Sequence, residues 1–165
     1  MKIPKIIELL ENSDVILRQS LLAVRPIEGC ALLIGNTKEL KNSQGAISYQ
    51  VQMIWPCCNI WEPSISFQKD IYKNQLFKLS KQNRFAIDPK EQIAAQKWAR
   101  GKQWKILGSA HSHPQSNANP SQTDLYCAGK SGLSIIIDCS GDIKAWWIKD
   151  HQQFEEIEVI FNLKK

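Results

Sequence analysis

Apolar side chains occupy every second position from Ala46 to Trp55, the pattern of a strand with one face in the core and one in water. A shorter apolar run from Cys30 to Ile34, closed by Gly35, has the pattern of a fully buried strand. We expect these two strands to pair with each other. Pro56 should end the alternating strand, because proline has no amide hydrogen to donate to a neighbouring strand.

The other strands are predicted in the last third of the chain. Trp104 to His113 is expected to be a strand that leads into a polar loop. Leu133 to Cys139 and Ile143 to Lys149 are apolar segments joined by Ser-Gly-Asp, which is a hairpin signal. Phe154 to Phe161 alternates and predicts one more strand.

Three segments carry helix signals. Asn-Ser-Asp at 12–14 offers N-caps for a helix that ends before Pro26, and a short helix or strand is expected ahead of it. Asp88 and Pro89 predict the start of a helix of about three turns that ends near Gly101. Ser121 to Ala128 predicts a short third helix, and residues 62–84 fit either a helix around 71–80 or a flexible loop.

A chain of 165 residues fits one compact domain that buries roughly 70% of its unfolded surface, so 1–165 is taken as a single domain. Its strands and helices predict a mixed α/β fold of the α+β type, with a largely antiparallel sheet flanked by two or three helices. The 43% hydrophobic and 22% charged residues are typical of a folded soluble protein and give no sign of disorder.

The N-terminal segment and the cysteines indicate a cytoplasmic protein. Charges interrupt the first 14 residues, so they lack the apolar stretch of a signal peptide, and no apolar run is long enough to span a membrane. The five cysteines include no C-x-x-C pair. We expect reduced thiols, with neither a disulfide framework nor cysteine ligation of a metal.

Positive charge is concentrated in the middle of the chain. Residues 62–105 hold ten Lys or Arg against four Asp or Glu, although the whole chain carries a net charge of only +5. Two interpretations stay open: a solvated helical face, or a surface for an acidic partner, either protein or nucleic acid.

The segment ILGSAHSHPQSNANPSQTD contains the residues most suited to chemistry. His111 and His113 are two apart at a strand end and therefore point the same way, as two ligands of one ion must. Asp124 follows eleven residues after His113, and a loop of that length can return a carboxylate to the two imidazoles. Three protein ligands with a fourth position for water is the arrangement of catalytic zinc. Glu28, just before a predicted strand, is the candidate general base that such a site needs.

Each of these residues also has a simpler structural explanation. A His-x-His pair is weakly specific by itself, and Glu28 fits an exposed carboxylate after a proline turn. Ser121 and Asp124 match the S-x-x-D capping box, which is a sufficient reason for both residues at a helix start. The combined set is harder to explain structurally than any one member.

Taken together, the motifs resemble the MPN/JAMM metalloprotease family. EGCALLIG from residue 28, HSHP from residue 111, and then Ser121 and Asp124 are similar to its pattern E…H-[ST]-H-P-x(6)-S-x-x-D. PCCN at 56–59 and FAIDP at 85–89 extend the resemblance to the bacterial branch over most of the chain. Residues 61–84 depart from it as an apparent insertion.

The resemblance implies that His111, His113 and Asp124 bind Zn2+, that Glu28 moves the proton of the zinc-bound water, and that Ser121 steadies the oxyanion. It also implies a curved sheet between helices, similar to that of the cytidine deaminases. Deaminase chemistry itself is not expected, because H-x-E and P-C-x-x-C are both missing.

The implied activity is zinc-dependent hydrolysis of the peptide or isopeptide bond after the C-terminal glycine of a ubiquitin-like protein of the sulfur-carrier type. The substrate's extended tail would lie along a sheet edge. The alternative is a non-catalytic MPN scaffold or protein-binding module, which is disfavoured because scaffold members typically lack the metal ligands. Nucleic-acid binding has no recognisable motif behind it. The substrate, the leaving group, the oligomeric state and the choice between zinc and iron or manganese stay open, although two imidazoles and one carboxylate suit zinc.

Overall fold

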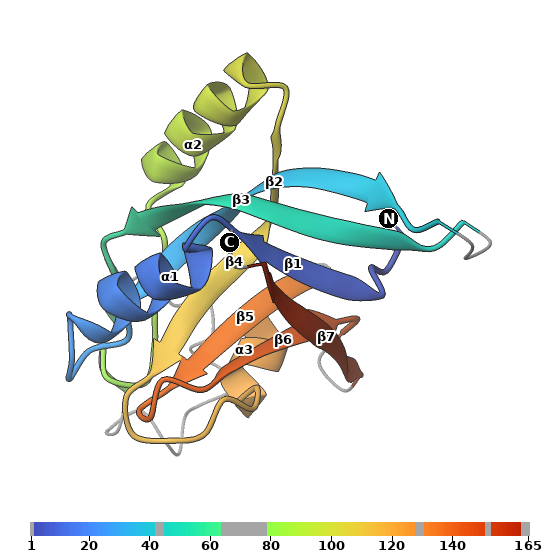
Figure 1. Cartoon of the computed structure of the whole chain (residues 1–165). Helices are drawn as coiled ribbons and strands as arrows, with labels where there is room; N and C mark the ends of the chain where they lie inside the picture. The colour runs from blue at the N-terminus through green and yellow to red at the C-terminus, as the bar shows by residue number, and fades with distance from the viewer. Residues whose placement is uncertain (1, 42–44, 64–78, 128–130, 151–152, 163–165) are drawn as a thin grey trace.

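The computed structural model describes residues 2–41, 45–63, 79–127, 131–150 and 153–162 (Figure 1). In these ranges it contains three helices: α1 (Ser13–Leu22), α2 (Pro89–Gly101) and α3 (Gln122–Cys127). The strands of the same ranges are β1 (Ile6–Leu10), β2 (Cys30–Glu39), β3 (Ile47–Cys57), β4 (Lys105–His113), β5 (Gly132–Asp138), β6 (Ile143–Ile148) and β7 (Phe154–Asn162).

The strands form one sheet that closes on itself as a barrel in the order β1-β3-β2-β4-β5-β6-β7. Among these strands β1 closes the ring, because it pairs in parallel with both β3 and β7. The β4–β5 pair is also parallel, and the other four neighbouring pairs are antiparallel. The mixed α/β class is thus confirmed, and the expected curvature goes as far as complete closure.

The predicted pairing of the first two apolar strands is confirmed, but both strands are longer than expected. Gly35 does not end β2; it lies at a register shift, where an added Cβ would come within 1.9 Å of the Gln50 carbonyl oxygen. Pro56 does not end β3, which continues to Cys57. The pairing with β1 stops at Val51, so Pro56 has a neighbouring strand on one side only, where a missing amide hydrogen is tolerated.

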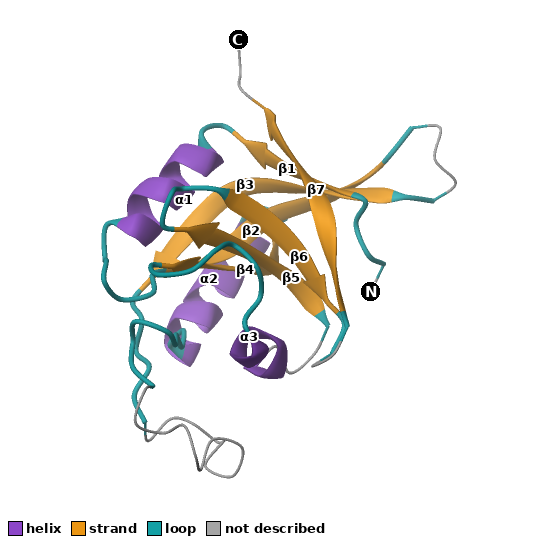
Figure 2. Cartoon of the chain, turned by 90° about the horizontal axis from the view of Figure 1, so that it is seen from below, coloured by secondary structure: helices purple, strands orange, loops and turns teal. Residues whose placement is uncertain are grey.

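The three predicted helices are present, and Figure 2 shows them outside the ring of strands. Asp88 caps α2 by accepting a hydrogen bond from the Lys90 amide at 2.8 Å. Asn12 precedes α1 in a left-handed conformation (φ 65°) and makes no side-chain cap, so only its position matches the prediction. The segment expected before α1 is the strand β1.

The core is divided between the inside and the outside of the barrel. Inside, α1 adds Leu17 and Leu21 to the inward-facing residues of the strands. Outside, α2 packs Ala95 and Ala99 against β2, while the residues around α3 form a smaller cluster with Trp146. His111 alternates with inward-facing Ala110 on β4, so the candidate site lies on the outer surface.

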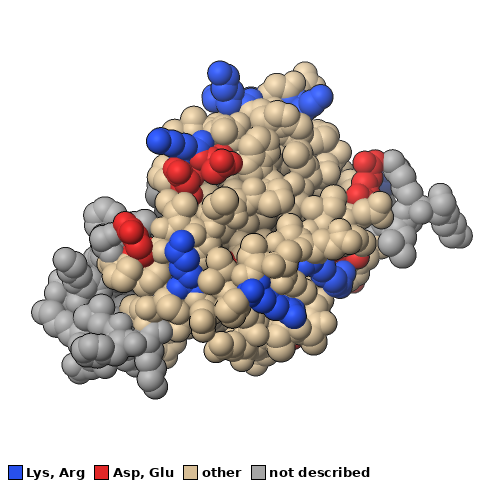
Figure 3. Space-filling model, turned by 90° about the vertical axis from the view of Figure 1, so that its left-hand side faces the viewer, with Lys and Arg blue, Asp and Glu red and all other residues tan. Residues whose placement is uncertain are grey.

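The described residues also give the state of the cysteines and the distribution of charge on α2. All five cysteines are free thiols. No helix among the described residues is long and apolar enough to cross a membrane. Lys90, Lys97 and Arg100 lie on the exposed side of α2, and the face in Figure 3 mixes both signs of charge instead of gathering one. Most of the segment taken as an insertion, 64–78, lies outside the described residues.

Candidate metal centre

The end of β4 carries two buried histidines on one face. The His111 and His113 rings are 1% and 4% exposed, and their Nε2 atoms lie 3.1 Å apart. Ser112 between them points the opposite way, as the alternation of a strand requires, and its Oγ donates a hydrogen bond to the Leu21 carbonyl of α1 at 3.2 Å. The alternation of side chains along the strand therefore places both imidazoles on one face.

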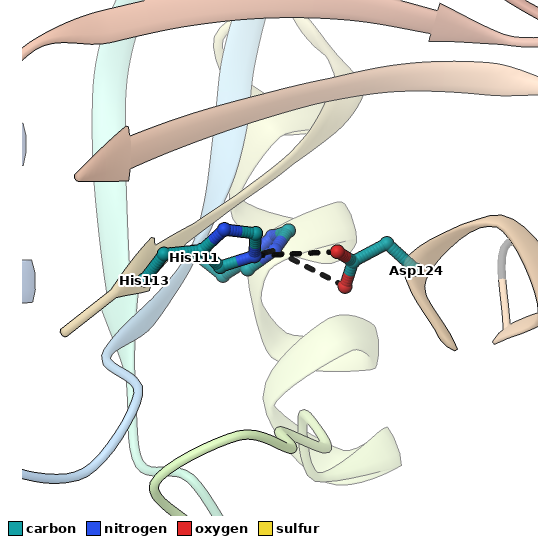
Figure 4. Close-up of side chains that lie close together, drawn as sticks. All are labelled: His111, His113 and Asp124. Atoms are coloured by element: carbon teal, nitrogen blue, oxygen red, sulfur yellow. Dashed lines mark hydrogen bonds and ion pairs between the residues drawn. The ribbon is translucent and has the colours of Figure 1, made fainter. Parts of the chain in front are cut away.

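Asp124 reaches the same point from the first turn of α3. Its Oδ1 lies 3.2 Å from His111 Nε2, and its Oδ2 lies 3.2 Å from His113 Nε2. Figure 4 shows the carboxylate directed at the two rings from the opposite side. One ligand atom from each of the three residues lies within 4.8 Å of the others. Two imidazole nitrogens and one carboxylate oxygen are a donor set that zinc accepts.

Ser121 and Asp124 form the capping box as well. The Ser121 amide donates to Asp124 Oδ2 at 2.6 Å, and the Asp124 amide donates to Ser121 Oγ at 3.2 Å. The structural explanation and the proposed metal site are thus compatible, because the cap fixes the carboxylate that faces the histidines. The Ser121 hydroxyl accepts in this cap and keeps its own proton available for donation.

Glu28 lies beside these residues because β2 pairs with β4. Cys30 is opposite His111 in the antiparallel register, and the Ser112 amide donates to the Gly29 carbonyl at 3.0 Å. The Glu28 side chain is buried, so the alternative of an exposed carboxylate is wrong. Burial raises the pKa of Glu28 to about 7, although the nearby His111 opposes the increase.

Electrostatics in the absence of a metal favour an ionised Asp124. Burial alone would raise its pKa, but the charge of His111 and hydrogen bonds from both histidines hold the pKa of this carboxyl well below its usual range. Burial alone would lower the pKa of His113, but its hydrogen bond with Asp124 outweighs this effect, so the pKa of His113 is raised overall. The Asp124 carboxylate therefore attracts both histidines even before any ion is bound.

The second nitrogens of the two rings differ in their surroundings. His113 Nδ1 lies 2.8 Å from the Asn117 carbonyl, a contact that fixes the proton on Nδ1 and leaves the Nε2 lone pair for a metal. His111 Nδ1 is buried and has no hydrogen-bond partner among the described residues. Instead the ring is stacked on Phe85, with centroids 4.5 Å apart and planes 23° apart.

The Glu28 carboxyl predicts a pH-dependent stability for protein stripped of metal with EDTA. The folded pKa of about 7 lies above the ordinary glutamate value of 4.5. The stability that Glu28 contributes is therefore complete below about pH 4.5 and is lost as the pH rises through 7. Glu28→Gln should not show this loss. Between pH 4.5 and 8.5 the unfolding free energy of the parent should therefore fall by about 3 kcal/mol more than that of the variant. Urea titrations of both proteins at several pH values measure it, and parallel pH profiles would contradict it.

Trp146 is a supporting residue that the sequence pattern did not single out, since it looks like any apolar residue of β6. Its indole Nε1 donates to the Ala118 carbonyl at 2.7 Å, in the loop between His113 and Asp124. Trp146→Phe is expected to leave that carbonyl unpaired and to lower the unfolding free energy by about 1–3 kcal/mol. Denaturant unfolding of the metal-free protein measures the change; a cost near zero would mean that water replaces the indole.

Comparisons with known proteins identify the family and the fold of the chain. The sequence model of the family described as prokaryotic homologs of the JAB domain matches residues 14–149. Protein DSY2949 from Desulfitobacterium hafniense has a similar solution structure, with a TM-score of 0.70 and 25% identity over 96% of this chain and 94% of that one. A Salinibacter ruber protein is similar in fold, with a TM-score of 0.59 and 20% identity over 94% and 91% of the two chains. No curated protein matches the chain.

Proposed function

Since the chain belongs to the family of prokaryotic homologs of the JAB domain, we propose that it is a zinc-dependent peptidase or isopeptidase. The observation that carries the proposal is the convergence of His111 Nε2, His113 Nε2 and the Asp124 carboxylate on one point, with Glu28 buried beside them. The proposed substrate is a ubiquitin-like protein of the sulfur-carrier type, cleaved after its C-terminal glycine.

His111, His113 and Asp124 would hold the zinc ion. The ion would supply a Lewis acid that polarises the scissile carbonyl and makes water more acidic. The residues fit this task, because the ligand atoms already face one another and Asp124 is ionised. His113 is also held in the tautomer that a metal ligand needs.

Glu28 is the proposed general base and acid. In the metal-free protein burial raises the pKa of this carboxyl to about 7, and a base whose pKa lies near the working pH is well suited to accept and return a proton. It takes a proton from the attacking water and then passes that proton to the amine that leaves. The carboxyl thus ends the cycle in its starting state, while the substrate gains one molecule of water across the broken bond.

Ser121 is proposed to stabilise the oxyanion that develops on the scissile carbonyl. Its Oγ accepts from the Asp124 amide, so the direction of the hydroxyl proton is free to serve the substrate. A donor aimed at the developing charge lowers the barrier by up to about 4 kcal/mol. The position of Ser121 in the cap keeps this donor at a fixed distance from Asp124.

The substrate tail is proposed to be extended and to end in glycines, since small residues let the scissile carbonyl approach the ligands closely. In the described barrel, a free sheet edge exists only where a strand outlasts its neighbour, as β3 does beyond Val51 and β2 beyond Gly35. The expected binding of the tail along a sheet edge is therefore limited to short segments.

The test is cleavage of a ubiquitin-like carrier with a C-terminal extension after Gly-Gly. Protein loaded with one equivalent of zinc should release the extension, and mass spectrometry should find a carrier that ends in glycine. An isopeptide-linked carrier assayed in parallel identifies the preferred leaving group. Protein that takes up no zinc, iron or manganese would overturn the proposal in favour of the non-catalytic scaffold.

A further inference from the structure

Asn59 lies where the chain leaves β3, next to the segment that leads into α2. It forms an isolated antiparallel bridge with Ile87, and the Ile60 amide donates to the Ala86 carbonyl at 3.0 Å. The Asn59 side chain is 8% exposed. It is thus a buried amide at a junction between two segments that are far apart in sequence.

All four hydrogen-bonding positions of this side chain are used. Its Nδ2 donates to the carbonyls of Glu28 at 3.0 Å and Arg84 at 2.8 Å. Its Oδ1 accepts from the amides of Trp61 at 3.0 Å and Ala86 at 3.2 Å. Two donors facing carbonyls and one oxygen facing two amides fix the orientation of the group, and no other side chain of this size offers the same combination.

Three of these bonds lead to residues beside the candidate metal centre. The Glu28 backbone is held on both sides, because its carbonyl accepts from Asn59 and its amide donates to the Lys81 carbonyl at 2.7 Å. Arg84 and Ala86 flank Phe85, whose ring is stacked on His111. One buried amide therefore connects the residue proposed as the base with the residue that covers a proposed ligand.

We propose that Asn59 is a positioning residue that sets the Glu28 carboxyl and the His111 ring relative to each other. The catalytic part of this proposal rests on the proposed function. Its structural part, the placement of the His111 ring against Phe85, does not. Losing the amide removes the hydrogen bonds to the carbonyls of Glu28 and Arg84 and releases both neighbours of Phe85. The polypeptide on both sides of the site then loses its shared anchor.

The first experiment is NMR of the metal-free protein, which needs no activity. Phe85 shields the His111 ring protons in the parent, so these resonances should lie upfield of those of an unstacked histidine. Asn59→Ala should move them downfield, as should Phe85→Leu. Ser48→Ala is the matched control: it removes a side-chain hydrogen bond of a buried residue in β3, from Ser48 Oγ to Glu8 at 2.7 Å, and should leave the His111 resonances unchanged.

The second experiment compares the zinc-loaded proteins. Asn59→Ala should lower kcat by about 10-fold to 100-fold with little change in KM, because displacement of a base by about 1 Å has a cost of that size. Asn59→Ser, which keeps one donor, should fall between Asn59→Ala and the parent. It also replaces Asn59→Ala in both experiments if that variant does not fold.

Folded Asn59 variants with parental His111 resonances and parental kcat would overturn the proposal and leave Asn59 a purely structural residue. If the parent itself cleaves no carrier, the proposed function fails, while the NMR comparison still decides whether Asn59 places His111. The two failures are therefore distinguishable.

Discussion

Glu28→Gln is expected to lower kcat by about 10²–10⁴-fold while the protein keeps one zinc ion per chain. Glutamine has nearly the same shape as glutamate but cannot accept the proton of the attacking water. The expected loss is specific to turnover, because Glu28 is separate from the three-residue ligand group. KM should change little if the carboxyl makes no contact with the substrate tail.

The measurement is steady-state cleavage of the extended carrier together with metal analysis of the same preparations. Asp142→Asn is a suitable control, since this exposed carboxyl lies in the turn between β5 and β6 and should leave turnover unchanged. A variant that retains zinc and parental kcat would rule out Glu28 as the base. A variant that loses zinc would assign it to metal binding instead.

Zinc itself is expected to stabilise the fold. A ligand present at a thousand times its dissociation constant adds about 4 kcal/mol to the unfolding free energy when it binds only the folded chain. His111, His113 and Asp124 come from two elements that meet only after folding, so the unfolded chain offers no comparable site. EDTA should reverse the effect completely.

Asp124→Asn separates this effect from general ionic stabilisation. The substitution removes the carboxylate ligand, so zinc should no longer raise the melting temperature, whereas Asp142→Asn should respond like the parent. Thermal unfolding with zinc, manganese or iron at matched concentrations measures both the effect and the metal preference. An equal response of Asp124→Asn and the parent would place the bound ion elsewhere on the chain.

The closed barrel shows where local patterns stop being informative. Alternation identified β3 and β7 as strands, because it depends only on the period of an extended chain. It did not give a single inward face for β3, since Tyr49 and Val51 belong to the cluster inside the barrel whereas Met53 and Trp55 pack outside it against α2. Alternation contains no information about which strands are neighbours, and the parallel pairing of β1 with β7 joins residues near opposite ends of the sequence. Pro56 was assigned as a strand end for the same reason, since its tolerance depends on which side of β3 is paired.

The sequence by itself determined which residues would form the three-residue cluster of the candidate site, because their placement depends on local geometry. A period of two puts His111 and His113 on one face, and a capping box puts Asp124 at a helix start. Only the tertiary structure decided that Glu28 is buried beside them, since its position depends on the register between β2 and β4. The same holds for Asn59 and Phe85. Their roles come from contacts between segments that are far apart in the sequence and approach one another only in the folded barrel.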